Sequence, residues 1–412
     1  MRVLVVNAGS STVKLSVLDG DCLIAARELS VDRGRVDAEQ VAAAVTGLGA
    51  VDAVGHRIVH GGARYRDAVR IDPEVVQALT ELSALAPLHQ AKSLAALAAV
   101  SQVLGHVPAI ACFDTAFHAT LPAAAFTYAL PEAWRERWGL RRYGFHGLAH
   151  ASAARRAGEL LHRPLQGLRV VTCHLGAGAS LAAVQDGRSV DTTMGFTPLD
   201  GLVMATRSGS LDPGMLLWLL EHTDLSAATM ARALEHECGL LALAGSADMR
   251  TILDDAVDGD ERARLALDVY EHRLRAGIAA MVAAMGGVDA LVFCGGVGEH
   301  ASAVRARAAA GLAFLGIAIS PDANEQGDGD REVTEPGSAV RTLVLRARED
   351  LEIVRQVHEL LYGTGFPPGR PVVRNGSSVQ SGQRQARGSW RQPNASVDDR
   401  RAAGGDDHRS DV

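Results

Sequence analysis

The sequence lacks the features that mark several common protein classes. Its five cysteines are scattered and none forms a C-x-x-C pair, so neither a disulfide framework nor a zinc site is indicated. A basic excess is missing too, because 48 acidic residues outnumber 41 Lys and Arg, and a net charge of -7 argues against a nucleic-acid partner. Reduced cysteines and the absence of a signal-peptide layout lead us to expect a cytoplasmic protein that binds small ligands.

A long uninterrupted apolar run is also missing. Residues 277–298 come nearest, with Asp289 as their one charge, and they are almost long enough to span a bilayer. Gly286 and Gly287 divide this stretch into an Ala-rich helical half and a short strand-like half at residues 291–293. We therefore expect no membrane segment.

The end of the chain differs from the rest in composition. Residues 363–412 contain no Leu, Ile or Met and are rich in Gly, Ser, Arg, Asp, Gln and Pro. Such a segment cannot bury enough apolar surface to fold, so we expect a disordered tail.

A short unit of strand, polar loop and strand occurs twice. Residues 3–20 and 170–187 align without a gap, so that Gly9 pairs with Gly176 and each segment ends in Asp-Gly. An internal duplication explains this match, and chance similarity between two hairpins is the alternative. Two related domains are therefore the expected architecture.

Helical and strand-like patterns alternate around these units, which predicts an α/β fold. The expected helices are residues 73–85, 92–104, 148–161 and 261–285, and the expected strands include residues 109–113. A strand near Leu291 leads into a glycine turn, residues 295–298, which should open another helix near Ala301. Strand, glycines and helix in this order are typical of a ligand-binding site.

The first loop has the chemistry of a phosphate site. Small residues let backbone N–H groups approach a phosphate, while Ser10 and Ser11 supply hydroxyls and Lys14 supplies a charge. The G-x-x-x-x-G-K spacing of a Walker loop is absent, so an ordinary polar hairpin remains the alternative.

Four further segments combine glycine with charged or imidazole groups. A single histidine beside an aromatic residue is usually structural, but four clusters in a chain with 4% aromatic residues favour a polar cleft. The segments are residues 56–62, 113–118, 143–147 and 191–209.

Taken in order, these motifs resemble those of acetate kinases. The resemblance is carried by Asn-Ala-Gly-Ser-Ser at residues 7–11, by the segment from Tyr143 to His150 and by Thr-Arg-Ser-Gly at 206–209, together with residues 55–62, 87–89, 113–118, 191–192 and 194–199. It extends from residue 1 to about residue 362. Acetate kinases transfer the γ-phosphoryl group of ATP to acetate, and belong with the sugar kinases, actin and the heat-shock-protein ATPases.

The resemblance implies two duplicated actin-like ATPase domains, of ribonuclease H-like type, with the active site in the cleft between them. Residues 1–116 with 352–362 would form the first domain, and residues 117–351 the second, on the nucleotide side. It further implies a homodimer, ATP or ADP as cosubstrate, and Mg²⁺ as the metal, with Mn²⁺ as a substitute.

The resemblance also assigns the roles of individual residues. Asn7 and Glu349 would hold Mg²⁺, and their oxygen donors suit that ion. Arg57 and Arg207 would clamp the carboxylate and the moving phosphoryl group, for which planar guanidinium donors are suited. Asp114 lies beside the arginines in the family, either acting directly or orienting them, and His146 would stabilise the transition state.

The two substrates have their own implied contacts. Arg57 and four apolar residues, Val59, Leu88, Phe145 and Pro198, would bind the acid; one methylene changes selectivity there by about 1–3 kcal/mol, so both acetate and propionate are candidate acids. The nucleotide would meet Ser10, Ser11, Lys14, His174, Gly176, Gly178, Asp248, Met249, Arg250, Gly295, Gly296 and Val297, and His89 would line the same cleft.

Two positions depart from the family pattern. Ala177 stands where the family usually has Asn, and Ser210 where it usually has Asp. These two departures leave open an ATP-binding regulator that has lost turnover. A propionate or butyrate kinase of the same superfamily is a separate alternative.

Overall fold

A computed structural model describes residues 1–9, 12–30, 36–84 and 87–363 of the 412-residue chain. Side chains at positions 84–89 are also outside the described part. The expectations for Ser10, Ser11, the side chains of Leu88 and His89, and the disordered tail at 364–412 therefore lie outside the described residues.

The first sheet has six strands in the order β3-β2-β1-β4-β6-β5. Strands β1, β2 and β3 form an antiparallel meander, β1, β4 and β6 run parallel, and β5 is antiparallel to β6. The strands are β1 (Arg2–Ala8), β2 (Thr12–Asp19), β3 (Cys22–Ser30), β4 (Ala53–Ile58), β5 (Val69–Arg70) and β6 (Ala109–Phe113).

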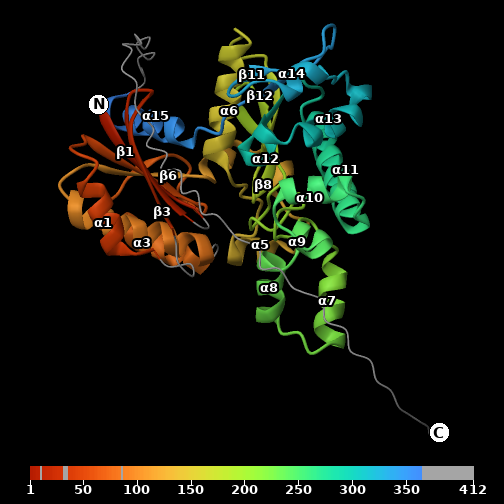
Figure 1. The fold of residues 1–412 in the computed structure, drawn as a ribbon. Coiled ribbons are helices and arrows are strands. Elements are labelled where there is room, and N and C mark those ends of the chain that lie inside the picture. The colour runs from red at the N-terminus through yellow and green to blue at the C-terminus, as the bar shows by residue number, and fades with distance from the viewer. Residues whose placement is uncertain (10–11, 31–35, 85–86, 364–412) are drawn as a thin grey trace, which may run out of the picture. The chain divides into compact units, whose positions relative to one another are not determined.

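Helices cover both faces of the first sheet because its central strands β1, β4 and β6 are buried on both sides (Figure 1). On β1, Leu4 and Val6 pack toward α1 (Ala38–Thr46) and α3 (Pro87–Leu104), while Val3 and Val5 pack toward α15 (Glu349–Tyr362). The last described helix thus returns to the first sheet. Beside α3 lie α2 (Pro73–Glu81) and the short 3-10 helix η1 (Leu82–Ala84).

The second sheet repeats this connectivity, with strand order β9-β8-β7-β10-β12-β11. Its β9, β8 and β7 form the antiparallel meander, β7, β10 and β12 run parallel, and β11 is antiparallel to β12. The strands are β7 (Arg169–Leu175), β8 (Ala179–Gln185), β9 (Arg188–Thr192), β10 (Ala290–Cys294), β11 (Arg331–Glu332) and β12 (Arg341–Val344). The shared topology confirms the duplication.

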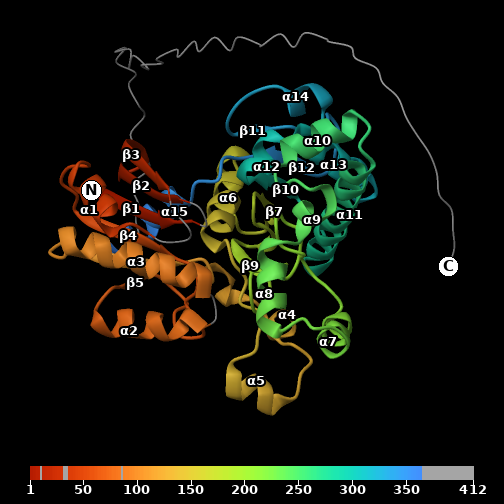
Figure 2. The same ribbon diagram turned by 60° about the horizontal axis from the view of Figure 1, so that its bottom comes forward.

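The second sheet also lies between helices, with α6 (Gly147–Leu160) on one side and α11 (Glu261–Ala284) on the other (Figure 2). Residue alternation on β10 explains this, since Leu291 and Phe293 pack in the cluster that includes α11, and Val292 packs in the cluster that includes α6. Asp260 caps α11 by accepting a hydrogen bond from the Ala263 N–H.

The remaining helices connect these layers. Between the first sheet and β7 they are η2 (Ala116–Thr120), α4 (Ala123–Phe126) and α5 (Glu132–Trp138). After β9 they are α7 (Pro213–His222), α8 (Ala227–His236), α9 (Gly239–Ala244), α10 (Met249–Val257), α12 (Gly295–His300), α13 (Ser302–Ala310), η3 (Ala313–Leu315) and α14 (Pro321–Glu325). The domain limits at residues 116, 351 and 362 stay predictions.

Two expectations about local structure need correction. The gapless pairing of the repeats fails at their loops, because Ala8 pairs with Val13 but Leu175 pairs with Ala179, so the second loop is one residue shorter. The turn after the hairpin is consequently Gly20-Asp21 in one copy and Asp186-Gly187 in the other. The prediction of a glycine turn at residues 295–298 is also wrong, because these residues belong to α12, which starts at Gly295.

The apolar stretch at residues 277–298 is divided as the sequence predicts. It is shared among α11, the positive-φ pair Gly286 and Gly287, strand β10 and the start of α12. Within the described ranges, every helix is too short or too polar to cross a membrane.

Candidate active site

Three polar or charged side chains expected in the active site lie at one edge of the first sheet. Asn7 lies near the carboxyl end of β1, Arg57 near that of β4, and Asp114 directly follows β6. These three strands are parallel neighbours, so their carboxyl ends lie at the same edge, where ligands of α/β proteins usually bind.

Arg57 is the centre of the polar contacts at this edge. Its Nη2 lies 2.7 Å from Asp114 Oδ2, and its Nε donates to both Asp114 oxygens at 3.2 and 3.1 Å. Its Nη1 donates to Asn7 Oδ1 at 3.0 Å and lies 3.2 Å from Glu349 Oε2. Asn7 Nδ2 completes the cluster by donating to Glu349 Oε2 at 2.7 Å. Residues 342 positions apart are thereby joined.

Burial and the neighbouring charges together set the pKa values of the central pair. Burial raises the pKa of Asp114 to about 6, because its effect together with that of Glu349 outweighs the opposing effect of Arg57. For Arg57, burial lowers the pKa, but the carboxylates of Asp114 and Glu349 more than compensate and the net shift is upward. Both shifts leave the guanidinium and the carboxylate charged at neutral pH.

The second sheet presents its own parallel strand ends. His174 lies near the end of β7 and Gly295 directly follows β10, its parallel neighbour. The loop after β7 is closed by a hydrogen bond from the Gly176 N–H to the Gly178 carbonyl, and the Ala177 carbonyl accepts from the Ala205 N–H. A Cβ atom at Gly295 would lie 2.7 Å from the Leu175 carbonyl oxygen, so only glycine fits there.

His146 and Arg207 approach this second loop. A Cβ atom at Gly178 would lie 3.4 Å from His146 Nε2 and 3.5 Å from Arg207 Nη1. Arg207 Nη1 also donates to the Pro198 carbonyl at 3.4 Å, and burial lowers its pKa. Gly178 therefore marks the point of the loop that an imidazole and a guanidinium approach together.

His146 itself is held in an uncommon conformation. It occupies the N-cap position of α6 with φ of 56°, a left-handed value that costs a residue with a side chain on the order of 1 kcal/mol or more. Its ring lies 4.7 Å from that of His174. Burial first, and then His174 and Arg57, lower the pKa of His146 well below its ordinary value, so the ring is neutral at pH 7.

A cavity of about 510 Å³ joins the two strand edges. It is lined by eight of the residues expected from the sequence: Asn7, Lys14, Arg57, His174, Gly176, Gly295, Gly296 and Glu349. Gly296 faces open space, because a Cβ atom there would meet nothing within 4 Å. Asp114, His146, Gly178 and Arg207 join the site through the contacts given above.

The supposed acyl and adenosine residues have mixed outcomes. Val59 and Phe145 are buried in the same apolar cluster. Asp248 and Arg250 are exposed and pair with each other at 2.9 Å, while Met249 is buried in the core behind them. Val297 also packs against that core. None of these last four residues lines the cavity described above.

Glu299 is a residue of the site that sequence reasoning missed. It lines the cavity, and its Oε1 accepts hydrogen bonds from the Gly295 N–H at 3.1 Å and the Ala347 N–H at 3.0 Å. The carboxylate thus ties the start of α12 to the segment that leads to Glu349. Its position four residues after Gly295 was the available signal.

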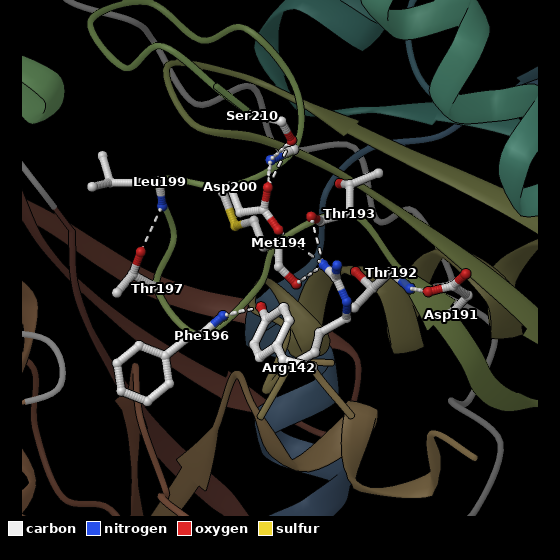
Figure 3. A network of polar contacts seen from close by, with 12 residues as sticks. Arg142, Asp191, Thr192, Thr193, Met194, Phe196, Thr197, Leu199, Asp200 and Ser210 are labelled. Carbon is white, nitrogen blue, oxygen red and sulfur yellow. Dashed lines mark hydrogen bonds and ion pairs between the residues drawn. The ribbon is translucent and has the colours of Figure 1, made fainter. Parts of the chain in front are cut away.

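Ser210 belongs to a network that holds the loop before Arg207 (Figure 3). Its Oγ donates to Asp200 Oδ1 at 2.6 Å, and Arg142 Nη1 contacts Asp200 Oδ2 at 3.3 Å. Arg142 Nη1 also donates to the carbonyls of Thr193 and Met194. A serine at this position therefore donates to a carboxylate that a second Asp would repel.

The comparisons with known proteins decide the family. The model of the acetokinase family matches residues 38–355. The chain belongs to the acetokinase family. It is 50% identical to an acetate kinase of Gloeobacter violaceus over 308 residues, which cover 74% of this chain and 76% of the relative. As a member of this family, the chain is an ATP-dependent kinase.

Solved structures agree with the α/β fold expected from the sequence. The crystal structure of Porphyromonas gingivalis acetate kinase matches with a TM-score of 0.79 and 35% identity, covering 86% of this chain and 98% of that one. A propionate kinase from Francisella tularensis matches with the same TM-score and coverage at 31% identity. The expected fold of two duplicated actin-like domains is confirmed.

Proposed function

We propose that this kinase transfers the γ-phosphoryl group of ATP to acetate, giving acetyl phosphate and ADP in a reversible reaction. The observation that carries the proposal is the cavity in which Arg57, Lys14 and the cluster of Asn7 and Glu349 face the glycines of the second sheet. Cationic donors on one wall and an unobstructed backbone on the other suit a nucleotide whose phosphates point toward Arg57.

The transfer is proposed to be direct and in line. An oxygen of the acetate carboxylate forms a bond to the γ-phosphorus while the bond from that phosphorus to the bridging oxygen breaks, and ADP leaves with the electron pair. Acetate is ionised at neutral pH, so no general base is needed. The protein then contributes positioning and charge neutralisation.

Each residue of the cluster has a part in that chemistry. Arg57 and Arg207 neutralise the charge on the acid and the moving phosphoryl group, and Asp114 fixes the plane of Arg57 through paired hydrogen bonds. His146 donates from its ring to the phosphoryl oxygens. Val59, Leu88, Phe145 and Pro198 are proposed to enclose the methyl group of acetate.

The side-chain oxygens of Asn7 and Glu349 are suited to bind a magnesium ion. Their amide and carboxylate groups lie within one hydrogen bond of each other and both border the cavity, and Mg²⁺ prefers a small number of such oxygen donors. When bound, Mg²⁺ or Mn²⁺ would neutralise charge on the β- and γ-phosphate oxygens. Within the described residues no group of three or more His, Cys, Asp or Glu forms a separate metal site.

Trapping of the acyl phosphate with hydroxylamine tests this function. The full chain would be incubated with ATP, Mg²⁺ and acetate, propionate or butyrate, with Arg57→Ala as the matched inactive control. We expect acetate to give the highest kcat/KM and propionate to be poorer by roughly 10- to 200-fold. If none of the three acids gives hydroxamate, the proposal is overturned and the non-catalytic regulator is favoured.

A propionate kinase is the second candidate function. The structural match to the Francisella tularensis propionate kinase is as close, by TM-score, as the match to an acetate kinase. A higher kcat/KM for propionate than for acetate in the same assay would favour it.

The homodimer and the cytoplasmic location are also proposals. The homodimer rests on the family resemblance, and sedimentation velocity would measure it directly. The location rests on the scattered cysteines of the sequence.

A further inference from the structure

Behind His146 lies a row of buried polar side chains that no step of the proposed reaction uses. Ser180, His150 and Thr172 are each 0% exposed. They come from three different elements, since His150 belongs to the first turn of α6, Thr172 to β7 and Ser180 to β8. Polar groups that are buried in this way must form hydrogen bonds with one another or with the backbone.

These side chains form one continuous chain of hydrogen bonds. His146 Nδ1 lies 2.9 Å from Ser180 Oγ, and Ser180 Oγ lies 2.7 Å from His150 Nε2. His150 Nδ1 in turn lies 2.7 Å from Thr172 Oγ1. The chain therefore runs without a break from a buried threonine to the ring that faces Gly178 and Arg207.

The chemistry of the chain permits only one proton per hydrogen bond. Burial first, and then His118 and His174, lower the pKa of His150 well below its ordinary value, so this ring is neutral like that of His146. A neutral imidazole carries one N–H, and a hydroxyl carries one proton. Since the buried Ser180 hydroxyl must also donate its proton to one of the two rings, the direction of the bond at Thr172 fixes the direction of every other bond.

Two ordered arrangements follow. If Thr172 donates to His150, then His150 Nε2–H donates to Ser180, Ser180 donates to His146 Nδ1, and His146 carries its proton on Nε2. If Thr172 donates to the Ala182 carbonyl instead, every bond reverses and His146 Nε2 is bare. The contact with Ala182 is long at 3.4 Å, so Thr172 gives up little by donating to His150.

We propose that Thr172, His150 and Ser180 form an ordering chain that fixes the ring of His146 with its Nε2–H directed at the phosphoryl group. His150 and Ser180 are then positioning residues that act through His146, and the inference rests on the proposed phosphoryl transfer. A bare nitrogen would repel an anionic phosphoryl oxygen, whereas an N–H donates to it. The chain supplies this donor without a positive charge on the ring.

Nitrogen NMR of the histidine rings tests the ordering independently of turnover. The full chain would be labelled with ¹⁵N histidine, and the His146 signals assigned by their loss in His146→Gln. We expect the proton on Nε2 of His146 in the wild type, with and without a nonhydrolysable ATP analogue. A proton on Nδ1, with Nε2 bare, would overturn the proposal even if the chain makes acetyl phosphate.

Kinetics of matched variants test the consequence. Ser180→Ala breaks the chain beside His146, and Thr172→Val removes its end with almost no change in shape. We expect Ser180→Ala to lower kcat by roughly 10- to 100-fold with KM for ATP changed less than about threefold. Thr172→Val should lower kcat by less, and Thr172→Ser should retain wild-type kcat because its hydroxyl is kept.

A double-mutant cycle separates positioning from folding. If Ser180 acts through His146, then Ser180→Ala should have no further effect on kcat in a His146→Gln background. Equal losses in both backgrounds would overturn the inference. Because Thr172→Val preserves packing, the His146 ring signals of this variant show whether the chain fixes the proton on Nε2 even if Ser180→Ala fails to fold. Absence of acyl phosphate from the wild type would instead refute the proposed function and leave the NMR result standing.

Discussion

Arg57 on β4 forms a forked ion pair with Asp114, the residue directly after the neighbouring strand β6, with Arg57 Nη2 at 2.7 Å from Asp114 Oδ2. Asp114 is only 1% exposed, so this pair is formed where solvent screens it weakly. The carboxylate fixes Nε and Nη2 of the guanidinium, and Nη1 is directed to Asn7 and Glu349.

Removal of either arginine should abolish most of the activity. Arg57→Ala and Arg207→Ala each delete a positive charge matched to the transferring phosphoryl group, so we expect kcat to fall by roughly a thousandfold. Acyl hydroxamate formation measures this loss. Arg232→Ala is the control, because Arg232 is 66% exposed and should be neutral. Turnover within a few-fold of wild type in a folded arginine variant would refute the clamp.

Asp114 should make folding stability depend on pH. Its folded pKa of about 6 lies above its ordinary value of 3.8, so the folded state binds the proton more tightly than the unfolded chain does. The stabilising contribution of Asp114 to the free energy of unfolding is therefore fully present below pH 4 and is lost as the pH rises to about 6. Asp114→Asn should remove that decline, so its Tm relative to wild type should rise between pH 4 and pH 6.5.

Thermal unfolding at both pH values measures this effect. Glu159→Gln is a suitable control, because Glu159 is 54% exposed and its loss should not change the pH slope in the same way. A difference in Tm between Asp114→Asn and wild type that stays constant over the range would contradict the raised pKa.

Filling the open wall of the cavity should weaken nucleotide binding. A Cβ atom at Gly296 meets nothing within 4 Å, so Gly296→Ala should fold and turn over normally, whereas Gly296→Gln would extend a side chain into the cavity. We expect Gln to raise KM for ATP by at least about tenfold while Tm is unchanged. Steady-state kinetics with ATP and with pyrophosphate would measure the effect.

The same experiment tests the choice of phosphoryl donor. ATP should remain preferred over pyrophosphate in the wild type. Ala177→Asn should change kcat/KM for ATP by less than about tenfold, because one neutral hydrogen bond contributes only about 0.5–1.5 kcal/mol. A wild-type preference for pyrophosphate over ATP, or an unchanged KM for ATP in Gly296→Gln, would contradict this placement of the nucleotide.

Restoring the family residue at position 210 should destabilise this chain. Ser210 Oγ donates to Asp200 Oδ1 at 2.6 Å, so Ser210→Asp replaces a donor with a second carboxylate. We expect a loss of about 1 kcal/mol in the free energy of unfolding at neutral pH, since a hydrogen bond is exchanged for repulsion near the surface. Urea unfolding measures it, with Ser210→Asn as the uncharged control. Equal stability of the Asp and Asn variants would show that charge repulsion is not the cause.

The sequence by itself determined the elements and the order of the site motifs. Continuous apolar runs in β1 and β10 specify strands buried on both faces, and Asp260 with the apolar pattern after it specifies α11. These signals are local, because strand and helix periods are expressed within a few residues of one another. The matching hairpins indicated the duplication for the same reason.

Only the tertiary structure decided which groups touch. The contact of Asn7 with Glu349 spans 342 positions and depends on α15 returning to the first sheet. The bridge from Ser180 to His146 and His150 depends on how α6 packs against β7 and β8, and the shorter second loop appears only in the strand register. Such contacts arise from the packing of distant elements at distances of about 3 Å, which no local periodicity encodes.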